Sequence, residues 1–544
     1  MRTTHFPIVC ALFLGCTAAD PAPPGTVPPD PVDGPEVEGD VAAPNACGFA
    51  DITANSGVDF TVNPRAEMPP GVDPELDVFL DEIAAGLVLA DLDGDGTLDL
   101  FLPQVAGPNA LYWGNGDGTF VEADAGDAVA RPEALDAVAS AADFDGDGLL
   151  DLVVMGTNTI ALLRNLGNGA FADETEARGL VALHRTAGTT AWADYDGDGD
   201  LDLYAGSNQG DGSYPSPEAL WRNDGDVFTN VLAGAASIDD EPSLGLHAIF
   251  SDMDDDGDQD LFVINDGGPV FSPSRLWENR GPDADGWRWT DRGRESDLSS
   301  IRFGMGAALV DLDGDGGEDL VASDIGPLGV FRRIGTWGFA DARESWMPDV
   351  PTTEDLISWS VVPLDLDGDG RPGLLVTYGS LGYPNPPVET EQADLFLRPR
   401  GEMDSFRLEP SSVFSSPTTV SSRGAAVGDI DGDLVPDLVV GRIDTPTAVF
   451  RSACPEGRRL VIDLRDEESP NRFGIGARVT VIGKRVVSQE VRAGGIGSFS
   501  GSGPTLYFGV GDVESVSTVR VRWPDGGITD LTDVCVNCRI TVTR

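Results

Sequence analysis

Cysteine and histidine are scarce in this chain. Its 544 residues include six cysteines and three histidines, and only His184 and His247 lie beyond the first few residues. A structural zinc site takes four ligands, usually from paired cysteines and histidines. Cys535-Val536-Asn537-Cys538 is the single closely spaced pair beyond the N-terminal segment, so the sequence argues against a zinc centre.

Basic residues are scarce as well. Lys and Arg number 35 against 92 Asp and Glu, which gives a formal net charge of −57. A surface of that charge repels phosphate backbones and anionic lipid headgroups. We therefore expect no nucleic-acid partner, and membrane contact only through an N-terminal lipid anchor. The expected partner is a macromolecule, either a protein or a glycan. The sequence does not indicate whether the protein is monomeric or oligomeric.

Long apolar segments are also missing. The apolar stretch at residues 8–14 is too short to cross a bilayer, so residues 1–16 are predicted to be an export signal. Leu14-Gly15-Cys16 resembles the end of a bacterial lipoprotein box, in which Cys16 would be lipidated, and conventional cleavage nearby is the alternative. Residues 17–46 hold eight prolines, six acids and no Lys or Arg, which predicts an extended tether. The protein is thus expected to be an outer-membrane or cell-surface lipoprotein, or to be secreted.

What the chain does contain is a nine-residue acidic motif, close to Asp-x-Asp-Gly-Asp-Gly-x-x-Asp, seven times at intervals of 51 to 64 residues. Carboxylates at positions 1, 3 and 5 can surround one hard cation if the backbone curls tightly, and glycines permit the positive φ angles of that curl. Position 7 would add a carbonyl, and position 9 would close the shell. Asp-Gly pairs also form hairpin turns without an ion. Turn formation gives no reason for an Asp at position 9 in six of seven copies, so Ca²⁺ binding is favoured.

The copies differ in completeness. The sixth, with Asp365, Asp367 and Asp369, has Gly373 at position 9 and is expected to bind weakly or not at all. The seventh has Leu434 in place of the second glycine, so its site is expected to be strained. Five to seven Ca²⁺ ions are therefore predicted. The ligands expected in the other six copies are Asp91, Asp93, Asp95, Thr97 and Asp99; Asp143, Asp145, Asp147, Leu149 and Asp151; Asp194, Asp196, Asp198, Asp200 and Asp202; Asp252, Asp254, Asp256, Asp258 and Asp260; Asp311, Asp313, Asp315, Gly317 and Asp319; and Asp429, Asp431, Asp433, Val435 and Asp437.

Four short apolar segments recur around each motif. The third ends in an aromatic or an Arg/Asn turn, as at residues 161–165, and the fourth opens with Phe or Trp. Four short strands per repeat, separated by Gly, Asp and Asn turns, are typical of a propeller blade. Residues 47–454 are therefore predicted to form a seven-bladed β-propeller.

The two ends of the repeat region predict how the ring closes. The seventh repeat stops after residues 448–452, before any fourth strand, whereas residues 49–58 resemble the fourth strand at 171–180. The N-terminal strand is therefore expected to complete the last blade. Cys47 and Cys454 flank the two halves of that blade, and a disulfide between them would close the ring. Cys535 and Cys538 are either a local disulfide or a redox pair, and a lone CxxC outside a β-α-β unit is a weak redox signal.

Residues 455–544 are predicted to be a small all-β module, like a sandwich or a barrel. Residues 478–482 and 519–523 alternate apolar and polar side chains, as strands do. Within the module, residues 494–498 read Gly-Gly-Ile-Gly-Ser and are predicted to be a flexible loop. No helix start follows this loop, so it is not a phosphate cradle.

The repeats resemble the FG-GAP or VCBS repeats of integrin-α-like propellers, and Phe303-Gly304-Met305-Gly306 comes near the motif that names them. Residues 471–479, 489–492, 506–511 and 519–526 together look like the ASPIC/UnbV domain. The combination is similar to the cartilage acidic protein family, which has bacterial members. The resemblance implies an exported calcium-binding propeller with a small β module and supplies no catalytic residues.

Two functions fit these patterns. The first is a non-enzymatic cell-surface scaffold for recognition or adhesion, stabilised by calcium. The alternative is a secreted hydrolase or lyase acting on polysaccharide, because clustered acids could serve as acid/base pairs. Nearly every clustered carboxylate is already assigned to a metal loop, and His184 and His247 lie just before acidic motifs, where a structural role is favoured. No nucleophile with its own base is visible, so no catalytic residue is predicted.

Overall fold

The computed structural model describes residues 47–62, 84–124, 126–183, 186–208, 218–232, 244–268, 272–283, 286–293, 295–296, 298–350, 356–380, 392–401, 407–415, 419–454, 457–495 and 497–544. The predicted signal peptide, tether, Cys16 and His184 lie outside them. No helix in these ranges is long and apolar enough to cross a membrane.

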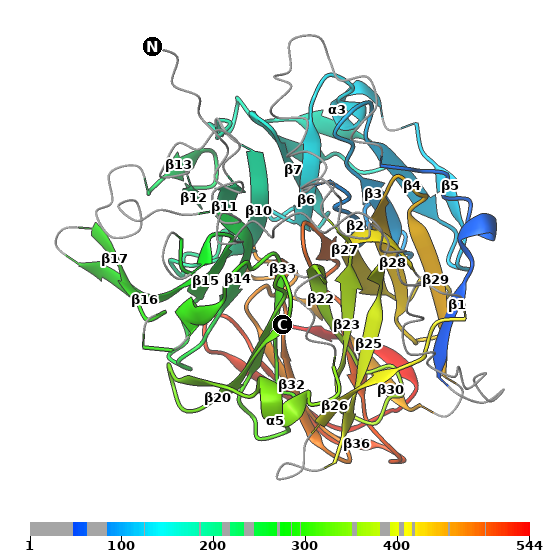
Figure 1. Cartoon of the computed structure of the whole chain (residues 1–544). Helices are drawn as coiled ribbons and strands as arrows, with labels where there is room; N and C mark the ends of the chain where they lie inside the picture. The colour runs from blue at the N-terminus through cyan, green and yellow to red at the C-terminus, as the bar shows by residue number, and fades with distance from the viewer. Residues whose placement is uncertain are drawn as a thin grey trace, which may run out of the picture.

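Seven sheets of four or five strands are arranged as blades around a common axis (Figure 1), as the sequence predicted. Their strands are β2 (Val88–Ala90), β3 (Asp99–Leu102), β4 (Ala110–Gly114) and β5 (Phe120–Glu122) in blade 1; β6 (Asp136–Ala142), β7 (Asp151–Gly156), β8 (Thr159–Asn165) and β9 (Phe171–Asp173) in blade 2; β10 (Thr186–Ala193), β11 (Asp202–Asn208), β12 (Ala219–Asn223) and β13 (Phe228–Asn230) in blade 3; β14 (Gly245–Ser251), β15 (Asp260–Asn265), β16 (Arg275–Asp283) and β17 (Gly286–Asp291) in blade 4; β18 (Ala307–Val310), β19 (Asp319–Ala322), β20 (Gly329–Arg333) and β21 (Phe339–Asp341) in blade 5; β22 (Ser358–Leu364), β23 (Gly373–Tyr378), β25 (Leu395–Arg400) and β26 (Arg407–Ser411) in blade 6; and β27 (Thr419–Gly428), β28 (Asp437–Ile443), β29 (Ala448–Ala453) and β1 (Gly48–Asp51) in blade 7.

The acidic motif fixes the same local structure in every blade. The second strand begins at position 9 of the motif, so the first eight residues form the hairpin that joins the first two strands. In blade 1, for example, Ala90 of β2 pairs with Asp99 of β3. The described short helices, α3 (Gly126–Ala130), α5 (Arg343–Trp346), η1 (Thr53–Asn55) and η2 (Leu298–Ser300), lie outside these hairpins, as does β24 (Gln392–Ala393), which pairs with β27.

The last blade is completed from the N-terminal side, which confirms that prediction. Strand β1 pairs antiparallel with β29, and Phe49 lies opposite Ser452. Phe49 is buried, and its ring stacks on that of Phe414. A disulfide joins Cys47 and Cys454 next to this pairing, so strands from the two ends of the repeat region are held together both by the sheet and by a covalent bond.

Removing this disulfide is expected to lower the free energy of unfolding by about 2 to 4 kcal/mol, because the bond restricts a very long loop in the unfolded chain. The change is Cys47→Ser with Cys454→Ser, measured by urea unfolding at constant calcium. The matched control is Cys535→Ser with Cys538→Ser, which opens a bridge between residues only 3 apart and should cost less. Alkylation of Cys47 or Cys454 in the unreduced native protein would contradict the ring closure.

The C-terminal residues form two further sheets that face each other. One contains β35 (Leu506–Gly509), β30 (Arg459–Arg465) and β38 (Cys538–Thr543); the other contains β32 (Val486–Glu490), β31 (Arg478–Ile482), β36 (Val516–Arg522) and β37 (Ile528–Val534). Leu460, Val479 and Trp523 are buried in a hydrophobic core that is continuous with that of the propeller. This module is sandwich-like, which agrees with the first of the two shapes predicted.

The glycine-rich segment of this module is not a flexible loop, so that prediction was wrong. Strand β33 (Ala493–Gly494) pairs with β10, and β34 (Gly501–Ser502) pairs parallel with β2. Figure 1 shows β33 at the centre of the ring, among the first strands of the blades. We call residues 493–503 the plug. Its described residues hydrogen-bond to, or lie next to, residues in or beside the first strand of each blade, among them Leu87, Ser140, Thr190, Ala248, Met305, Ser360 and Ala425.

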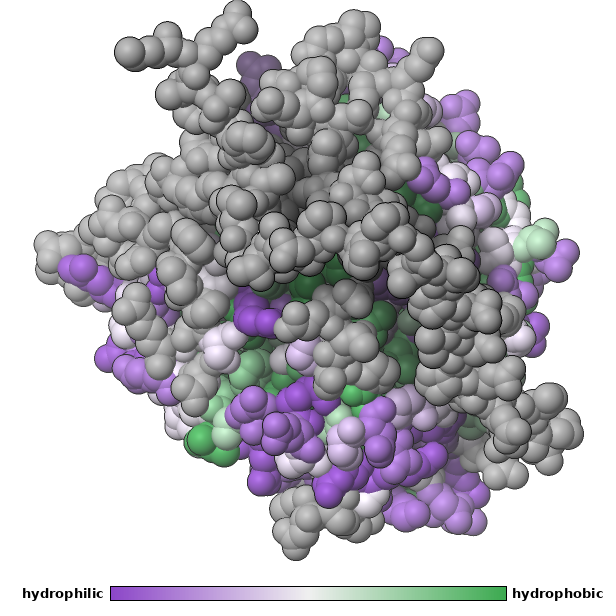
Figure 2. Space-filling view, in the orientation of Figure 1, coloured by the Kyte–Doolittle hydropathy of each residue, from purple (hydrophilic) through white to green (hydrophobic). Residues whose placement is uncertain are grey.

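Small residues explain why the plug fits. A Cβ atom added at Gly494 would lie 2.5 Å from the Thr190 carbonyl oxygen, and one at Gly495 would lie 2.4 Å from that of Ala248. No side chain fits at either position without moving backbone. On the face seen in Figure 2, hydrophobic residues are visible near the middle, and hydrophilic residues lie mainly below them and along the right edge. The axis of the propeller is therefore a packed part of the core.

Candidate metal-binding loops

The position-1 carboxylate organises the curl of each loop. In blade 1, Asp91 Oδ1 accepts a hydrogen bond from the Gly94 N–H (2.8 Å), and Oδ2 accepts one from the Gly96 N–H (3.1 Å). Asp311 accepts the equivalent pair from Gly314 and Gly316 in blade 5. These bonds hold the backbone in the tight turn that could bring the remaining acids together.

Two loops reach this curl without a glycine at one of its positions. Gly94 and Gly96 have φ of +79° and +91°, which only glycine adopts freely. Asp255 takes φ +62° in the fourth loop, where Asp is tolerated. Leu434 takes φ +70° in the seventh and donates its N–H to Asp429 Oδ2 as the glycine would. The seventh loop therefore keeps its shape with a branched side chain in a strained conformation.

The Asp at position 9 has a structural role as well as being a predicted ligand. Asp99 is fully buried; its Oδ2 accepts the Leu92 N–H (2.7 Å), and its Oδ1 accepts the Gly114 N–H (2.9 Å) on the third strand. The same two bonds recur at Asp151, Asp202, Asp260, Asp319 and Asp437. This Asp therefore fastens the loop to the third strand, a role that the sequence did not reveal.

Burial opposes ionisation of these acids. It raises the pKa of Asp99 to about 7, that of Asp319 and Asp437 to about 8, and that of Asp260 to about 9. Two N–H donors, one to each oxygen, favour the ionised carboxylate. A buried anion in this position calls for a nearby positive charge.

Acids of each of the first five loops lie close enough together to share an ion. Ligand atoms of Asp91, Asp93 and Asp99 lie within 4.8 Å of one another, as do those of the corresponding trios in loops 2 and 3; in loops 4 and 5 the trio is positions 1, 3 and 5. The position-7 residues Thr97, Leu149, Asp200, Asp258, Gly317 and Val435 each donate their N–H to the position-5 carboxylate.

Several carboxylate oxygens in these loops lack a hydrogen-bond donor. Asp194 Oδ1, Asp196 Oδ1, Asp252 Oδ1 and Asp258 Oδ1 are buried and have no partner among the described residues. Carboxylate oxygens that converge in this way fit a hard cation. The loops could therefore hold metal ions, and their donor set contains oxygen alone.

The sixth loop cannot regain its missing acid. A Cβ atom on Gly373 would lie 2.7 Å from the Leu397 carbonyl oxygen and 2.8 Å from the Phe396 ring. The buried Arg459 instead donates to the Leu366 carbonyl oxygen at position 2 of this loop. Burial still raises the pKa of Asp365 to about 7. The loss of position 9 is thus built into the packing of blade 6.

Arginines on the third strands also contact the loops, and the sequence interpretation missed them. Arg332 Nε lies 2.8 Å from Asp313 Oδ2, and its Nη2 lies 3.0 Å from Asp315 Oδ2. The signal was present in the sequence, since Arg164, Arg222, Arg332, Arg398 and Arg451 follow the same apolar pair at the end of the third strand.

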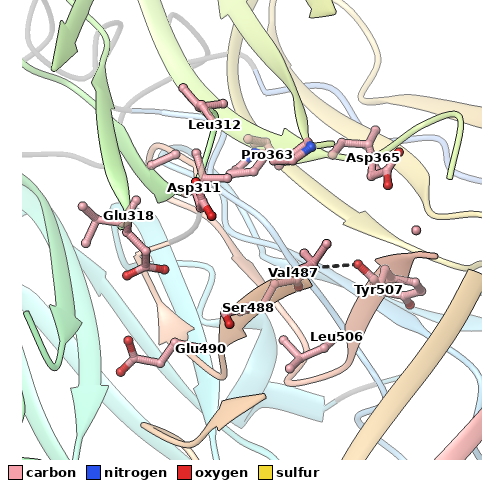
Figure 3. Close-up of a pocket in the computed structure, with 18 of the residues that line it drawn as sticks. Asp311, Leu312, Glu318, Pro363, Asp365, Val487, Ser488, Glu490, Leu506 and Tyr507 are labelled. Carbon is pink, nitrogen blue, oxygen red and sulfur yellow. Dashed lines mark hydrogen bonds between the residues drawn. The ribbon is translucent and has the colours of Figure 1, made fainter. Parts of the chain in front are cut away.

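The C-terminal module packs on the loops. Arg472 donates to the Gly146 carbonyl oxygen in loop 2 (3.0 Å), Arg522 contacts Asp252 in loop 4, and the Tyr507 hydroxyl accepts the Asp429 N–H in loop 7 (3.0 Å). A cavity of about 490 Å³ remains between loops 5 and 6 and the module (Figure 3). Glu318 and Glu490 lie together at one end of the cavity in this view.

Both glutamates in the cavity already have ion-pair or hydrogen-bond partners. Arg492 Nη2 lies 3.0 Å from each Glu318 oxygen and 3.3 Å from Glu490 Oε2, and Gln259 donates to Glu490 Oε1. His247 is also fully buried, and desolvation lowers its pKa to about 4. The contacts of the two glutamates are structural, and the structural role of His247 stays a prediction that its burial fits.

Comparison with known proteins agrees with this architecture. A model of an FG-GAP-like repeat matches residues 91–154, 143–205 and 252–322, and a model described as ASPIC and UnbV matches residues 467–544. The chain therefore contains FG-GAP-like repeats in its propeller and a C-terminal ASPIC/UnbV domain. This confirms the resemblance predicted from its motifs.

The chain is similar to cartilage acidic protein 1. It is 26% identical over 417 residues to the Xenopus tropicalis protein, covering 72% of this chain and 61% of the relative. It is 25% identical over 427 residues to the Homo sapiens protein, covering 71% and 60%. The match thus spans about three fifths of each relative.

Two lectin structures also overlap with it in part. An Agrocybe aegerita lectin, described as recognising non-reducing terminal N-acetylglucosamine, has a TM-score of 0.38 at 19% identity and covers 60% of this chain and 80% of its own. The BP39L lectin of Burkholderia pseudomallei has a TM-score of 0.40 at 12% identity and covers 68% and 96%.

Proposed function

We propose that the protein is an exported, calcium-stabilised propeller scaffold that serves recognition or adhesion and has no catalytic activity. The main support is the buried position-9 Asp of six loops, whose two N–H donors favour the ionised form although burial opposes it, together with the carboxylate oxygens without partners in loops 3 and 4. Ca²⁺ would supply the missing positive charge, and flexible oxygen-only loops suit it better than Mg²⁺. The acids at positions 1, 3, 5 and 9 and the position-7 carbonyl would hold it in loops 1 to 5 and 7.

Calorimetry on chelator-stripped protein tests the calcium assignment. We expect five to seven sites and a rise in melting temperature, because an ion that binds only the folded state stabilises it by about 2.7 kcal/mol per site at 100 times its Kd. Asp311→Asn should remove one site, whereas Asp530→Asn, at an exposed acid outside the loops, should remove none. Absence of both binding heat and thermal shift in the parent protein would refute the assignment.

The contacts of the two glutamates in the cavity support a non-catalytic role. Glu318 and Glu490 share Arg492, so neither is free to act as an acid or a base. Export, lipidation of Cys16 and a protein or glycan partner stay predictions. A glycan array with and without chelator tests them against the alternative: calcium-dependent retention without turnover supports a scaffold, and release of shortened polysaccharide would establish a hydrolase or lyase.

A further inference from the structure

Arginine side chains stand against the acidic loops of several blades. Arg164 contacts Asp145 and Asp147 in loop 2, with Nη2 3.1 Å from Asp147 Oδ2. Arg332 makes the equivalent pair of contacts in loop 5. Loops 6 and 7 have one such contact each, Arg398 to Asp367 (2.6 Å) and Arg451 to Asp431 (2.6 Å). In loops 2 and 5 the guanidinium binds the carboxylates at positions 3 and 5, and in loops 6 and 7 it binds the one at position 3; the proposed ion would also need these carboxylates.

The other three blades differ at this position. Trp113 replaces the arginine in blade 1, and no ion pair to loop 1 is present among the described residues. Arg222 in blade 3 pairs with Asp224, outside the motif (2.9 Å). Glu278 stands there in blade 4, where an arginine from the C-terminal module, Arg522, contacts Asp252 instead.

We propose that these arginines act as resident cations that set the calcium affinity of each loop. The inference rests on the proposed calcium binding. A guanidinium on a ligand carboxylate stabilises the metal-free loop by neutralising part of its charge, and it repels an incoming divalent cation. Loop 1, which has no arginine on its third strand, is therefore the tightest site, whereas Arg222 still interacts electrostatically with Asp196 of loop 3. Loops 2 and 5, where two carboxylates are paired, are the weakest of the complete ones.

The consequence is a graded response to calcium. At low calcium the ion occupies loop 1, next to the plug strand β34 and the N-terminal side of the ring. The arginine-paired loops keep their shape without an ion and fill as the concentration rises. In blade 4 the arginine on a ligand carboxylate comes from the C-terminal module, so the affinity of loop 4 depends on how that module packs.

Arg164→Gln and Arg332→Gln test this, each measured by calcium titration calorimetry and by the melting temperature of the metal-stripped protein. Each substitution should make one site about fivefold tighter and should lower the metal-free melting temperature. Arg332→Lys, which keeps the charge, should stay close to the parent in both readouts. Arg520→Gln, which breaks an exposed pair with Asp530 away from the loops, is the matched control and should leave calcium binding unchanged.

The outcomes separate the two proposals. Asp91→Asn should abolish the tightest class of sites and leave the weaker class. If the parent protein binds no calcium, the proposed function and this inference both fall. If the parent binds calcium but Arg332→Gln and Arg164→Gln bind it with equal or lower affinity, the arginine role is wrong and calcium binding stands.

Discussion

Gly495→Ala is expected to lower the free energy of unfolding by about 4 kcal/mol, since it adds left-handed strain and forced overlap in a packed core. Gly495 has φ +64°, and its added Cβ would meet the Ala248 carbonyl oxygen at 2.4 Å. That oxygen belongs to the backbone of β14, so no side-chain rotation relieves the contact. The midpoint of urea unfolding at fixed calcium measures the change.

Gly526→Ala is the control that measures the backbone strain of a left-handed alanine without any overlap of its Cβ atom. Gly526 has φ +81°, and nothing lies within 4 Å of its added Cβ. It should therefore cost only the conformational penalty, about 1 kcal/mol. Equal losses for the two variants would mean that the plug does not fill the axis of the propeller in solution.

Arg492→Met is expected to cost about 3 to 5 kcal/mol, because it removes one partner of a buried ion cluster and leaves the others uncompensated. Arg492 donates to Glu318 of loop 5 and to Glu490 at the end of β32, and its Nη2 also donates to Ser251 Oγ (3.2 Å). Burial raises the pKa of Glu490, so protonation would relieve part of the loss at low pH. The decrease in the free energy of unfolding should therefore be larger at pH 7 than at pH 5.

Arg520→Met is the matched control for this experiment. Arg520 of β36 forms a bidentate pair with Asp530 of β37, where both side chains are exposed. Exposed pairs contribute little to stability, so unfolding should shift only slightly. A similar shift for Arg492→Met would show that the interface between propeller and module is wet and weakly coupled.

Much of the propeller could be predicted because its signals are local. The nine residues of each motif contain both the carboxylate that caps the curl and the residue that starts the next strand, as Asp91 and Asp99 do. The unpaired β29 end and the strand-like residues near Phe49 similarly predicted how the ring closes. The weakness of loop 6 was visible as Gly373, although its cause, packing by Phe396, was not.

The plug could not be predicted because its sequence is also that of a mobile loop. Gly494, Gly495 and Gly497 have positive φ, and such freedom in an isolated segment indicates flexibility. Only the first strands of the seven blades, drawn from across the chain, form the narrow axis that these residues fill. The contact between Arg492 and Glu318 could not be predicted either, because the two residues are 174 positions apart in sequence.

By itself the sequence determined the blade count, the acidic loops and the two-part architecture, since hydrophobic periodicity and turn chemistry act over a few residues. The tertiary structure alone decided that the position-9 Asp binds the third strand, which loop carboxylates the arginines contact, and that residues of the C-terminal module fill the axis of the propeller. These features depend on burial and on partners from distant segments. Whether a carboxylate is desolvated or paired is fixed only when such segments pack together.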